Sequence, residues 1–140
     1  MGLQSDGYSN PDDILADLDW VFAELRDSMN RGDSLDLTLA IFLQRFFEVH
    51  PFIDGNGRIA RLFCDLLASS NGQQFIWRAE AEANYTAGLE MGHAGRARNS
   101  SHADDEHDPR RIDCLDPLRA IVRELLADRN LDSVEEEPQL

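Results

Sequence analysis

The sequence predicts an all-α protein that forms a single domain. Apolar residues recur at helical spacing in several segments, turn residues separate these segments, and no stretch shows the alternation typical of a half-buried strand. At 140 residues, of which 42% are hydrophobic, the chain is long enough to bury the core of several helices. We expect an N-terminal segment over residues 1–11, a helical domain over residues 12–130, and an acidic, disordered tail over residues 131–140.

The first helix is expected to begin at Asn10 and Pro11 and to end at Gly32. Asparagine is a favourable helix cap, and proline suits the first helical position because its missing N–H would be unpaired there anyway. One apolar stripe follows this helix and consists of Ile14, Leu18, Val21, Phe22, Leu25 and Met29.

A second helix is expected from a cap at Asp33 or Ser34 to Val49, and apolar residues cover so much of its circumference that we expect it to be central and buried. These residues are Leu35, Leu37, Leu39, Ile41, Phe42, Leu43, Phe46 and Phe47. A third helix is expected from about Gly57 to Ser70, where Asn71-Gly72 is a suitable end. Its apolar positions are Ile59, Leu62, Phe63, Leu66 and Leu67.

The second half of the chain is expected to contain two more helices. One spans residues 79–91, although Gly88 weakens its helical propensity. The polar stretch 94–111 is expected to loop out, and its histidines and carboxylates are interpreted as a solvated loop rather than a metal site. The last helix is expected to start with Asp116 as its cap and Pro117 at its first position. Its apolar face consists of Leu118, Ile121, Val122, Leu125 and Leu126.

The connection between the second and third helices has the most informative sequence, HPFIDGNGRIAR over residues 50–61. Pro51 disfavours continuation of the second helix, because the residue before a proline is pushed out of the helical region. Gly55 and Gly57 allow a ligand to approach the main chain closely. Their N–H groups, next to the start of a new helix, favour an anion-binding site that the helix dipole reinforces.

The charged residues of this loop suit a phosphate site. Arg58 and Arg61 share a helix face and can bind phosphates as planar forks. Asp54 is a suitable carboxylate for Mg²⁺ bound to phosphate oxygens, and His50 is a candidate general base. Phe52 is interpreted as an apolar anchor beneath the loop. Each of these residues alone has an ordinary structural explanation, but together they favour phosphate binding.

This segment is similar, position by position, to the HPFx[D/E]GNGRxxR signature of Fic-domain proteins. The resemblance implies a helical domain with the motif loop between two central helices, and transfer of AMP from ATP to a Ser, Thr or Tyr hydroxyl of a target protein. It implies a base at His50, an Mg²⁺ ligand at Asp54, and phosphate contacts from Gly55, Asn56, Gly57, Arg58 and Arg61. The Doc-like branch, which phosphorylates its target, usually has lysine in place of Gly57, so the glycine favours nucleotide transfer.

Two features common in Fic proteins are not found in this sequence. Only about eleven residues precede the first helix, which leaves little length for the β-hairpin flap that holds the target backbone. The inhibitory pattern [S/T]xxxE[G/N] is approached at residues 86–91 and 133–138, but Met91 and Pro138 break its last position. We therefore expect either inhibition by a separate antitoxin chain or an unrestrained enzyme.

The composition limits the classes of binding partner and the cellular compartment that we expect. The net charge of −14 comes from 27 acidic and 13 basic residues, so we expect neither nucleic acid nor an anionic membrane as a partner. Cys64 and Cys114 lack a metal-ligand spacing, and we interpret Cys64 as a small buried residue. With no apolar span or signal peptide, a cytoplasmic location is the default, and delivery into a host cell would need another route.

Two other functions stay open from the residues alone. Base selection lies outside the motif, so a related transferase could use UTP, GTP or another donor. The domain could also bind a nucleotide or a protein without turnover.

Overall fold

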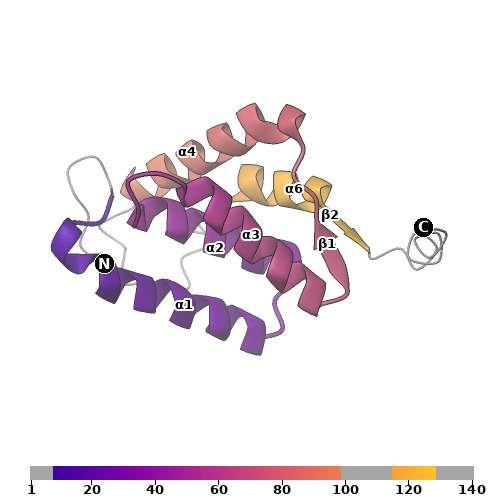
Figure 1. The fold of residues 1–140 in the computed structure, drawn as a ribbon, viewed down its shortest axis with the longest axis horizontal. Coiled ribbons are helices and arrows are strands. Elements are labelled where there is room, and N and C mark those ends of the chain that lie inside the picture. The colour runs from indigo at the N-terminus through magenta and orange to yellow at the C-terminus, as the bar shows by residue number, and fades with distance from the viewer. Residues whose placement is uncertain (1–7, 99–114, 129–140) are drawn as a thin grey trace.

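The computed structural model describes residues 8–98 and 115–128 and shows a helical domain (Figure 1). Its elements in chain order are η1 (Pro11–Asp13), α1 (Ile14–Asn30), α2 (Leu35–Val49), α3 (Asn56–Ser70), β1 (Gln73–Phe75), η2 (Ala79–Ala81), α4 (Glu82–Arg98), α6 (Asp116–Leu125) and β2 (Leu126–Asp128). The predicted all-α class is confirmed, and the motif loop connects α2 to α3. Within the described ranges, no helix has both the length and the apolar character needed to cross a bilayer.

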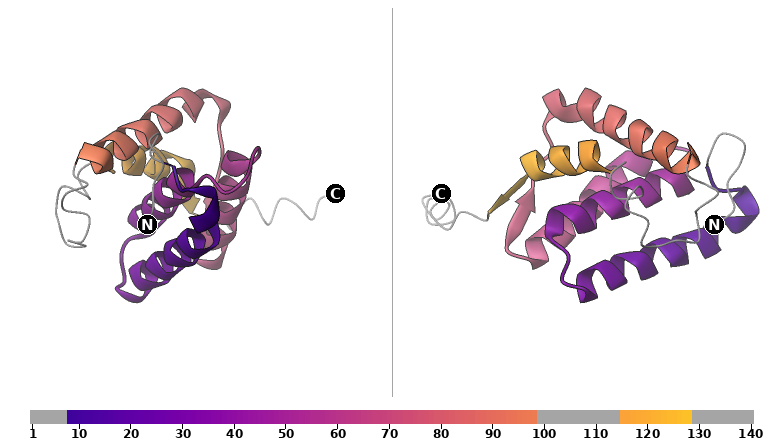
Figure 2. Two further views of the ribbon diagram at one scale, coloured as in Figure 1. Left: turned by 90° about the vertical axis from the view of Figure 1, so that its left-hand side faces the viewer. Right: turned by 180° about the vertical axis from the view of Figure 1, so that it is seen from behind.

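Helix α2 is the centre of the domain. Figures 1 and 2 show it between α1 on one side and α4 and α6 on the other, with α3 alongside. Leu39, Phe42 and Leu43 are each at most 1% exposed. The prediction of a central buried helix is therefore confirmed, and the physical reason is the one that the sequence offers: apolar side chains surround this helix on nearly all sides.

Helix α1 packs on α2 through part of its predicted stripe. Val21 and Leu25 are buried, whereas Phe22 and Met29 remain 42% and 47% exposed. Phe22 still contacts the core at its edge, since its ring lies 6.0 Å from that of Phe42 and 5.5 Å from that of Phe63. The chain enters α1 through the 3₁₀ turn η1, so Pro11 begins η1 rather than α1.

Helix α3 packs on the core through small residues and only part of the predicted apolar set, since Phe63 and Leu67 are partly buried there. Ala60, Cys64 and Ala68 are at most 3% exposed, while Leu62 and Leu66 are 61% and 60% exposed. Small residues at intervals of four allow a helix backbone to approach its neighbours closely. The interpretation of Cys64 as a small buried residue is confirmed, and burial raises the pKa of its thiol. Cys114 lies outside the described residues.

A two-stranded antiparallel sheet joins the ends of α3 and α6, which the sequence did not predict. Gln73 pairs with Asp128 and Phe75 with Leu126. The Ile76 N–H donates to the Leu125 carbonyl at 2.8 Å, just beyond the sheet. Strands of three residues are too short to show a periodic pattern, which explains why this element was missed.

Helices α4 and α6 pack closely because of a glycine. A Cβ atom at Gly88 would lie only 3.2 Å from the Leu118 Cα. Helix α4 continues to Arg98, so the predicted loop from residue 94 is wrong as far as that residue, and residues 99–111 lie outside the described part of the chain. The cap of α6 is Leu115, and Asp116 is its first helical residue rather than its cap. The predicted acidic tail, residues 131–140, also lies outside the described residues. The predicted limits of the helical domain stay a prediction.

The start of α2 is tied to α6 by a small charge cluster. The Nε atoms of Arg119 and Arg123 each lie 2.7 Å from Asp36 Oδ2. Burial would raise the pKa of Asp36, but hydrogen bonds from Arg119, Ser34 and Arg123 outweigh it and lower the pKa to about 2. A depressed carboxyl pKa stabilises the fold above the unfolded value, near 4, and this contribution disappears as the pH falls towards 2.

We expect Asp36→Asn to destabilise the protein by about 2 kcal/mol at pH 6, since the pKa shift corresponds to roughly that free energy. Urea unfolding of both proteins between pH 2 and 6 measures the difference, which should shrink towards zero at the acid end. Asp19→Asn, at an exposed position of α1, is the matched control. A difference that persists at pH 2 would show that the aspartate acts through packing instead.

Candidate active site

The motif loop begins with a left-handed residue. His50 caps the end of α2 with φ 52° and ψ 59°, and its N–H donates to the Phe46 carbonyl at 3.0 Å. This conformation costs a non-glycine residue about 1–2 kcal/mol, and among the described residues His50 alone adopts it without being glycine. Strained backbone of this kind is concentrated at functional sites. The left-handed conformation of His50 turns the chain sharply into Pro51. The predicted position of His50 at the end of the helix is confirmed.

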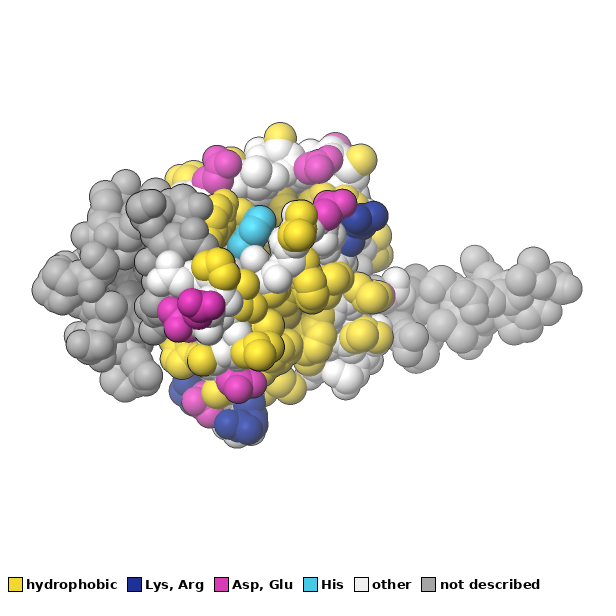
Figure 3. Space-filling model, turned by 60° about the vertical axis from the view of Figure 1, so that its left-hand side comes forward, with side chains coloured by type: hydrophobic (Ala, Val, Ile, Leu, Met, Phe, Trp, Pro, Cys, Tyr) yellow, Lys and Arg dark blue, Asp and Glu magenta, His cyan; other side chains and the backbone are white. Residues whose placement is uncertain are grey.

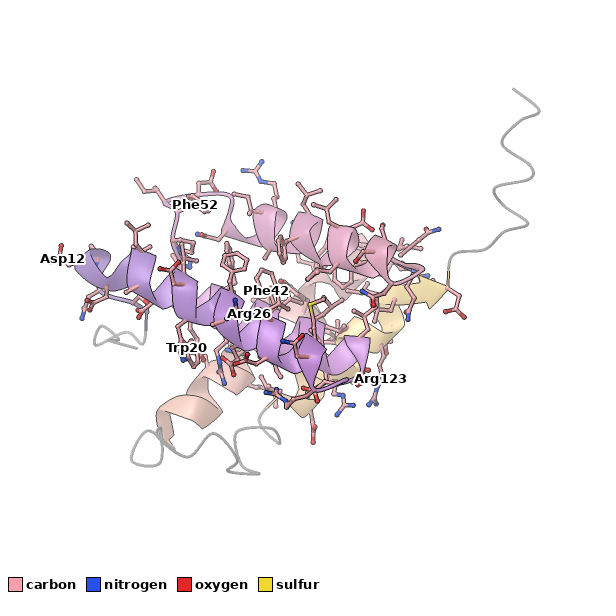
Figure 4. All side chains as sticks on the ribbon, turned by 90° about the horizontal axis from the view of Figure 1, so that it is seen from below. Asp12, Trp20, Arg26, Phe42, Phe52 and Arg123 are labelled. Atoms are coloured by element: carbon pink, nitrogen blue, oxygen red, sulfur yellow. The ribbon has the colours of Figure 1, made fainter. Side chains whose placement is uncertain are left out.

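The loop is held by the Asn56 side chain. Its Oδ1 accepts the Phe52 N–H at 2.9 Å, and its Nδ2 donates to the Phe52 carbonyl at 2.7 Å. Phe52 itself is 46% exposed, and Figure 4 shows it in the loop ahead of α3. The prediction that Phe52 anchors the loop is therefore wrong. The two hydrogen bonds of the Asn56 amide hold the loop instead. Phosphate binding by Asn56 would then rest on its main chain.

The two glycines serve the loop in different ways. Gly55 has φ 87° at the cap of α3, where a side chain would be strained, and its N–H donates to Asp54 Oδ1 at 2.8 Å. Gly57 instead leaves room for an arginine, since a Cβ there would lie 3.1 Å from Arg61 Nη1. The first turn of α3 therefore presents main-chain N–H groups beside a guanidinium, which is a suitable arrangement for an anion.

The two motif arginines have different surroundings. Arg58 is exposed, with its Nη2 3.6 Å from Asp54 Oδ2. Arg61 is half-buried, and its Cζ lies 4.3 Å from the centre of the Trp77 ring. Asp65, one turn after Arg61, holds the start of the next element, because its Oδ1 accepts the Phe75 N–H at 3.2 Å.

A pocket of about 220 Å³ lies between α2, α3 and α4 beside the motif loop. It is lined by Leu43, Phe46, Phe47, His50, Asn56, Gly57, Ala60, Arg61, Glu82, Tyr85, Thr86 and Leu89. The structure thus brings His50, Asn56, Gly57 and Arg61 together at one cavity, whereas Asp54 and Arg58 do not line it. Figure 3 shows a histidine at the surface, bordered by hydrophobic side chains.

Helix α4 supplies a pocket wall that the sequence reasoning missed. Glu82, Tyr85, Thr86 and Leu89 all line the pocket and are spaced i, i+3, i+4 and i+7, which places them on one helix face. This spacing is a signal that the sequence carries, but only packing decides that the face meets the motif loop. Burial raises the pKa of the Tyr85 hydroxyl, so Tyr85 lines the pocket as a neutral phenol.

A buried polar network fixes α2 against α4 below the loop. Gln44 Nε2 donates to the Leu89 carbonyl at 3.2 Å and to Glu48 Oε1 at 3.3 Å. His93 Nδ1 lies 3.8 Å from the same Glu48 oxygen, and the Tyr8 ring lies 5.6 Å from that of His93 and 4.7 Å from that of His50. The network therefore connects the position of His50 to α4 and to the segment before α1.

The carboxylate predicted to bind Mg²⁺ is accessible. The Asp54 side chain is 91% exposed at the mouth of the loop. No group of three or more potential metal ligands occurs in residues 8–98 and 115–128. Mg²⁺ in nucleotide sites is usually bound by one or two carboxylates together with substrate phosphates, and Asp54 is an accessible carboxylate of this kind.

Residues 4–68, which include the complete motif and most of α3, match the Fic/DOC family. The match covers 65 of the 140 residues of the chain, so over this segment the chain is similar to Fic/DOC proteins. The protein adenylyltransferase fic-1 of Caenorhabditis elegans is 34% identical over 88 residues, which cover 57% of this chain and 17% of that protein. The chain therefore spans less than a fifth of the length of that relative. No solved structure matches it significantly.

Proposed function

We propose that this chain is a Fic-type protein adenylyltransferase, which transfers AMP from ATP to a hydroxyl side chain of a target protein. The observation that carries the proposal is the shared cavity of His50, Gly57 and Arg61 at the start of α3. A candidate base, an anion-binding helix end and a cationic fork lie around one space. These are the components that nucleotide transfer needs, because its catalysis is mostly positioning and charge stabilisation.

The phosphates would bind at the first turn of α3. The main-chain N–H groups there and the positive end of the helix dipole favour an anion. Gly57 lets the phosphates approach the main chain without a side chain in the way, and the Arg61 guanidinium lies next to it. In the proposed complex Arg61 binds the distal phosphates, which directs the α-phosphorus towards His50.

The reaction would begin at the target hydroxyl. His50 accepts the hydroxyl proton while the hydroxyl oxygen forms a bond to the α-phosphorus of ATP. The bond from the α-phosphorus to the oxygen that bridges it to the β-phosphorus breaks, and pyrophosphate leaves with the electron pair. The αL conformation of His50 and its contact with Tyr8 would hold the imidazole at the pocket rather than along the axis of α2.

Asp54 would hold Mg²⁺ at the lip of this site. The ion would neutralise charge on the phosphates and on the leaving pyrophosphate. Asp54 Oδ1 also accepts the Gly55 N–H, which fixes the carboxylate relative to the loop. Arg58 lies beside this carboxylate, with its Nη2 3.6 Å from Asp54 Oδ2.

The proposed partner is a protein with an accessible Ser, Thr or Tyr hydroxyl, and labelled ATP tests the proposal. With Mg²⁺ and a cell lysate, the protein is expected to transfer label from [α-³²P]ATP, but not from [γ-³²P]ATP, to itself or to a lysate protein. Label from the γ-phosphate would instead show kinase activity. A panel of UTP, GTP and CTP identifies a different donor, and tight ATP binding without transfer would indicate a binding module.

A further inference from the structure

Arg61 packs on an aromatic ring outside the motif. Its Cζ lies 4.3 Å from the centre of the Trp77 ring, within the range of a cation–π contact. Trp77 belongs to the connection between β1 and η2, far from the motif in sequence. An arginine stacked on a ring uses the face of its guanidinium, while its N–H donors point outwards in the guanidinium plane. The contact therefore leaves the donors available for phosphate oxygens.

The Arg61 guanidinium is confined on a second side. Its Nη1 lies where a Cβ of residue 57 would approach to 3.1 Å, so the guanidinium rests against the main chain at the start of α3. A helical side chain that reaches back one turn towards the N-terminus is in its usual direction. The absence of a side chain at Gly57 and the presence of the Trp77 ring together define one position for the fork.

Trp77 is itself held in place. Its ring meets that of Tyr85 edge-on, with centroids 5.0 Å apart and an interplanar angle of 81°. Tyr85 is only 5% exposed and comes from α4, and the residue before Trp77 donates its N–H to the Leu125 carbonyl. Two neighbouring elements thus fix the ring on which Arg61 rests.

We propose that Trp77 is a positioning residue for phosphate binding, which holds the Arg61 guanidinium ready before the nucleotide arrives. The inference rests on the proposed function, because it concerns the same phosphate site. An unrestrained arginine loses rotamer entropy when it is fixed by a ligand. Because Arg61 is stacked on Trp77, part of this entropy is already lost on folding. The distal phosphates therefore bind more tightly than they would to an equally charged but mobile arginine.

The test compares Trp77→Leu with Trp77→Phe. We expect Trp77→Leu to raise the Kd for Mg-ATP about tenfold by calorimetry, and to raise the KM for ATP more than it lowers kcat. Trp77→Phe keeps an aromatic face and should retain most of the affinity. In the Arg61→Ala background, Trp77→Leu should cause no further loss. Circular dichroism checks that each variant is folded, and Trp77→Phe keeps the test valid if the leucine variant is not.

Trp20→Leu is the matched control, because Trp20 also lies under an arginine, with Arg45 Cζ 5.5 Å from its ring centre. It should leave the Kd for Mg-ATP unchanged. Equal Kd values for the parent protein and Trp77→Leu, or an undiminished loss in the Arg61→Ala background, would overturn the inference while leaving the proposed function intact. Normal ATP binding without transfer by the parent protein would overturn the proposed function alone. A parent protein that does not bind ATP would overturn both.

Discussion

Replacing His50 by alanine is expected to lower the rate of AMP transfer about 100-fold or more, since a positioned general base contributes at least that factor. Mg-ATP binding should change little, because the proposed anion site consists of the start of α3 and Arg61 and does not include the imidazole. His50 is exposed, so its removal leaves the core intact. The rate is measured as incorporation of label from [α-³²P]ATP, and binding is measured by calorimetry.

The backbone of His50 requires a second variant as a control. The left-handed conformation at φ 52° is unfavourable for alanine, so a loss of activity in His50→Ala could reflect a rearranged loop. Asparagine tolerates this conformation better than most residues but cannot act as a base at neutral pH. His50→Asn should therefore be as inactive as His50→Ala while melting at the parental temperature. Transfer at the parental rate by either variant would remove His50 from the mechanism.

The parts of the fold that the sequence predicted are those fixed by local chemistry. The ends of α2 and α3 coincide with Pro51, Gly55 and Asn71-Gly72, because proline and glycine restrict or release the backbone whatever surrounds them. The apolar circumference of α2 likewise required a central position. In the site, the same reasoning placed His50 at a helix end and the glycines at the start of the next helix.

The parts that the sequence did not predict depend on which surfaces meet. Helix α3 buries Ala60, Cys64 and Ala68 most deeply and leaves Leu62 and Leu66 exposed, because its neighbours approach closely on the side with small residues. Asn56 binds the main chain of Phe52, a choice between two uses of one amide that only the loop geometry makes. Trp77 meets Arg61 through the packing of β1 and α4, and no spacing within the motif indicates a partner sixteen residues away.

The structure also predicts unequal roles for the two motif arginines. Arg61 lines the pocket and rests on Trp77, whereas Arg58 has a side chain that is 74% exposed and does not line the pocket. We expect Arg61→Ala to lower kcat/KM for ATP by more than 100-fold, since it loses a charged phosphate partner and the orientation that this partner imposes. Arg58→Ala should lower it by about tenfold or less, because exposed ion pairs contribute little.

The melting temperatures of the same two variants separate this role from a structural one. The stacking of Arg61 on Trp77 contributes about 0.5–1 kcal/mol, as cation–π contacts at partly exposed sites do, so Arg61→Ala should melt only about 2–4 °C below the parent protein. Arg58→Ala should melt at the parental temperature. A large drop for Arg61→Ala would assign the residue to stability, and equal kinetic losses in the two variants would mean that the pocket does not distinguish them. A small drop in melting temperature with a large drop in kcat/KM is the pattern expected of an arginine that the fold positions and that binds the nucleotide.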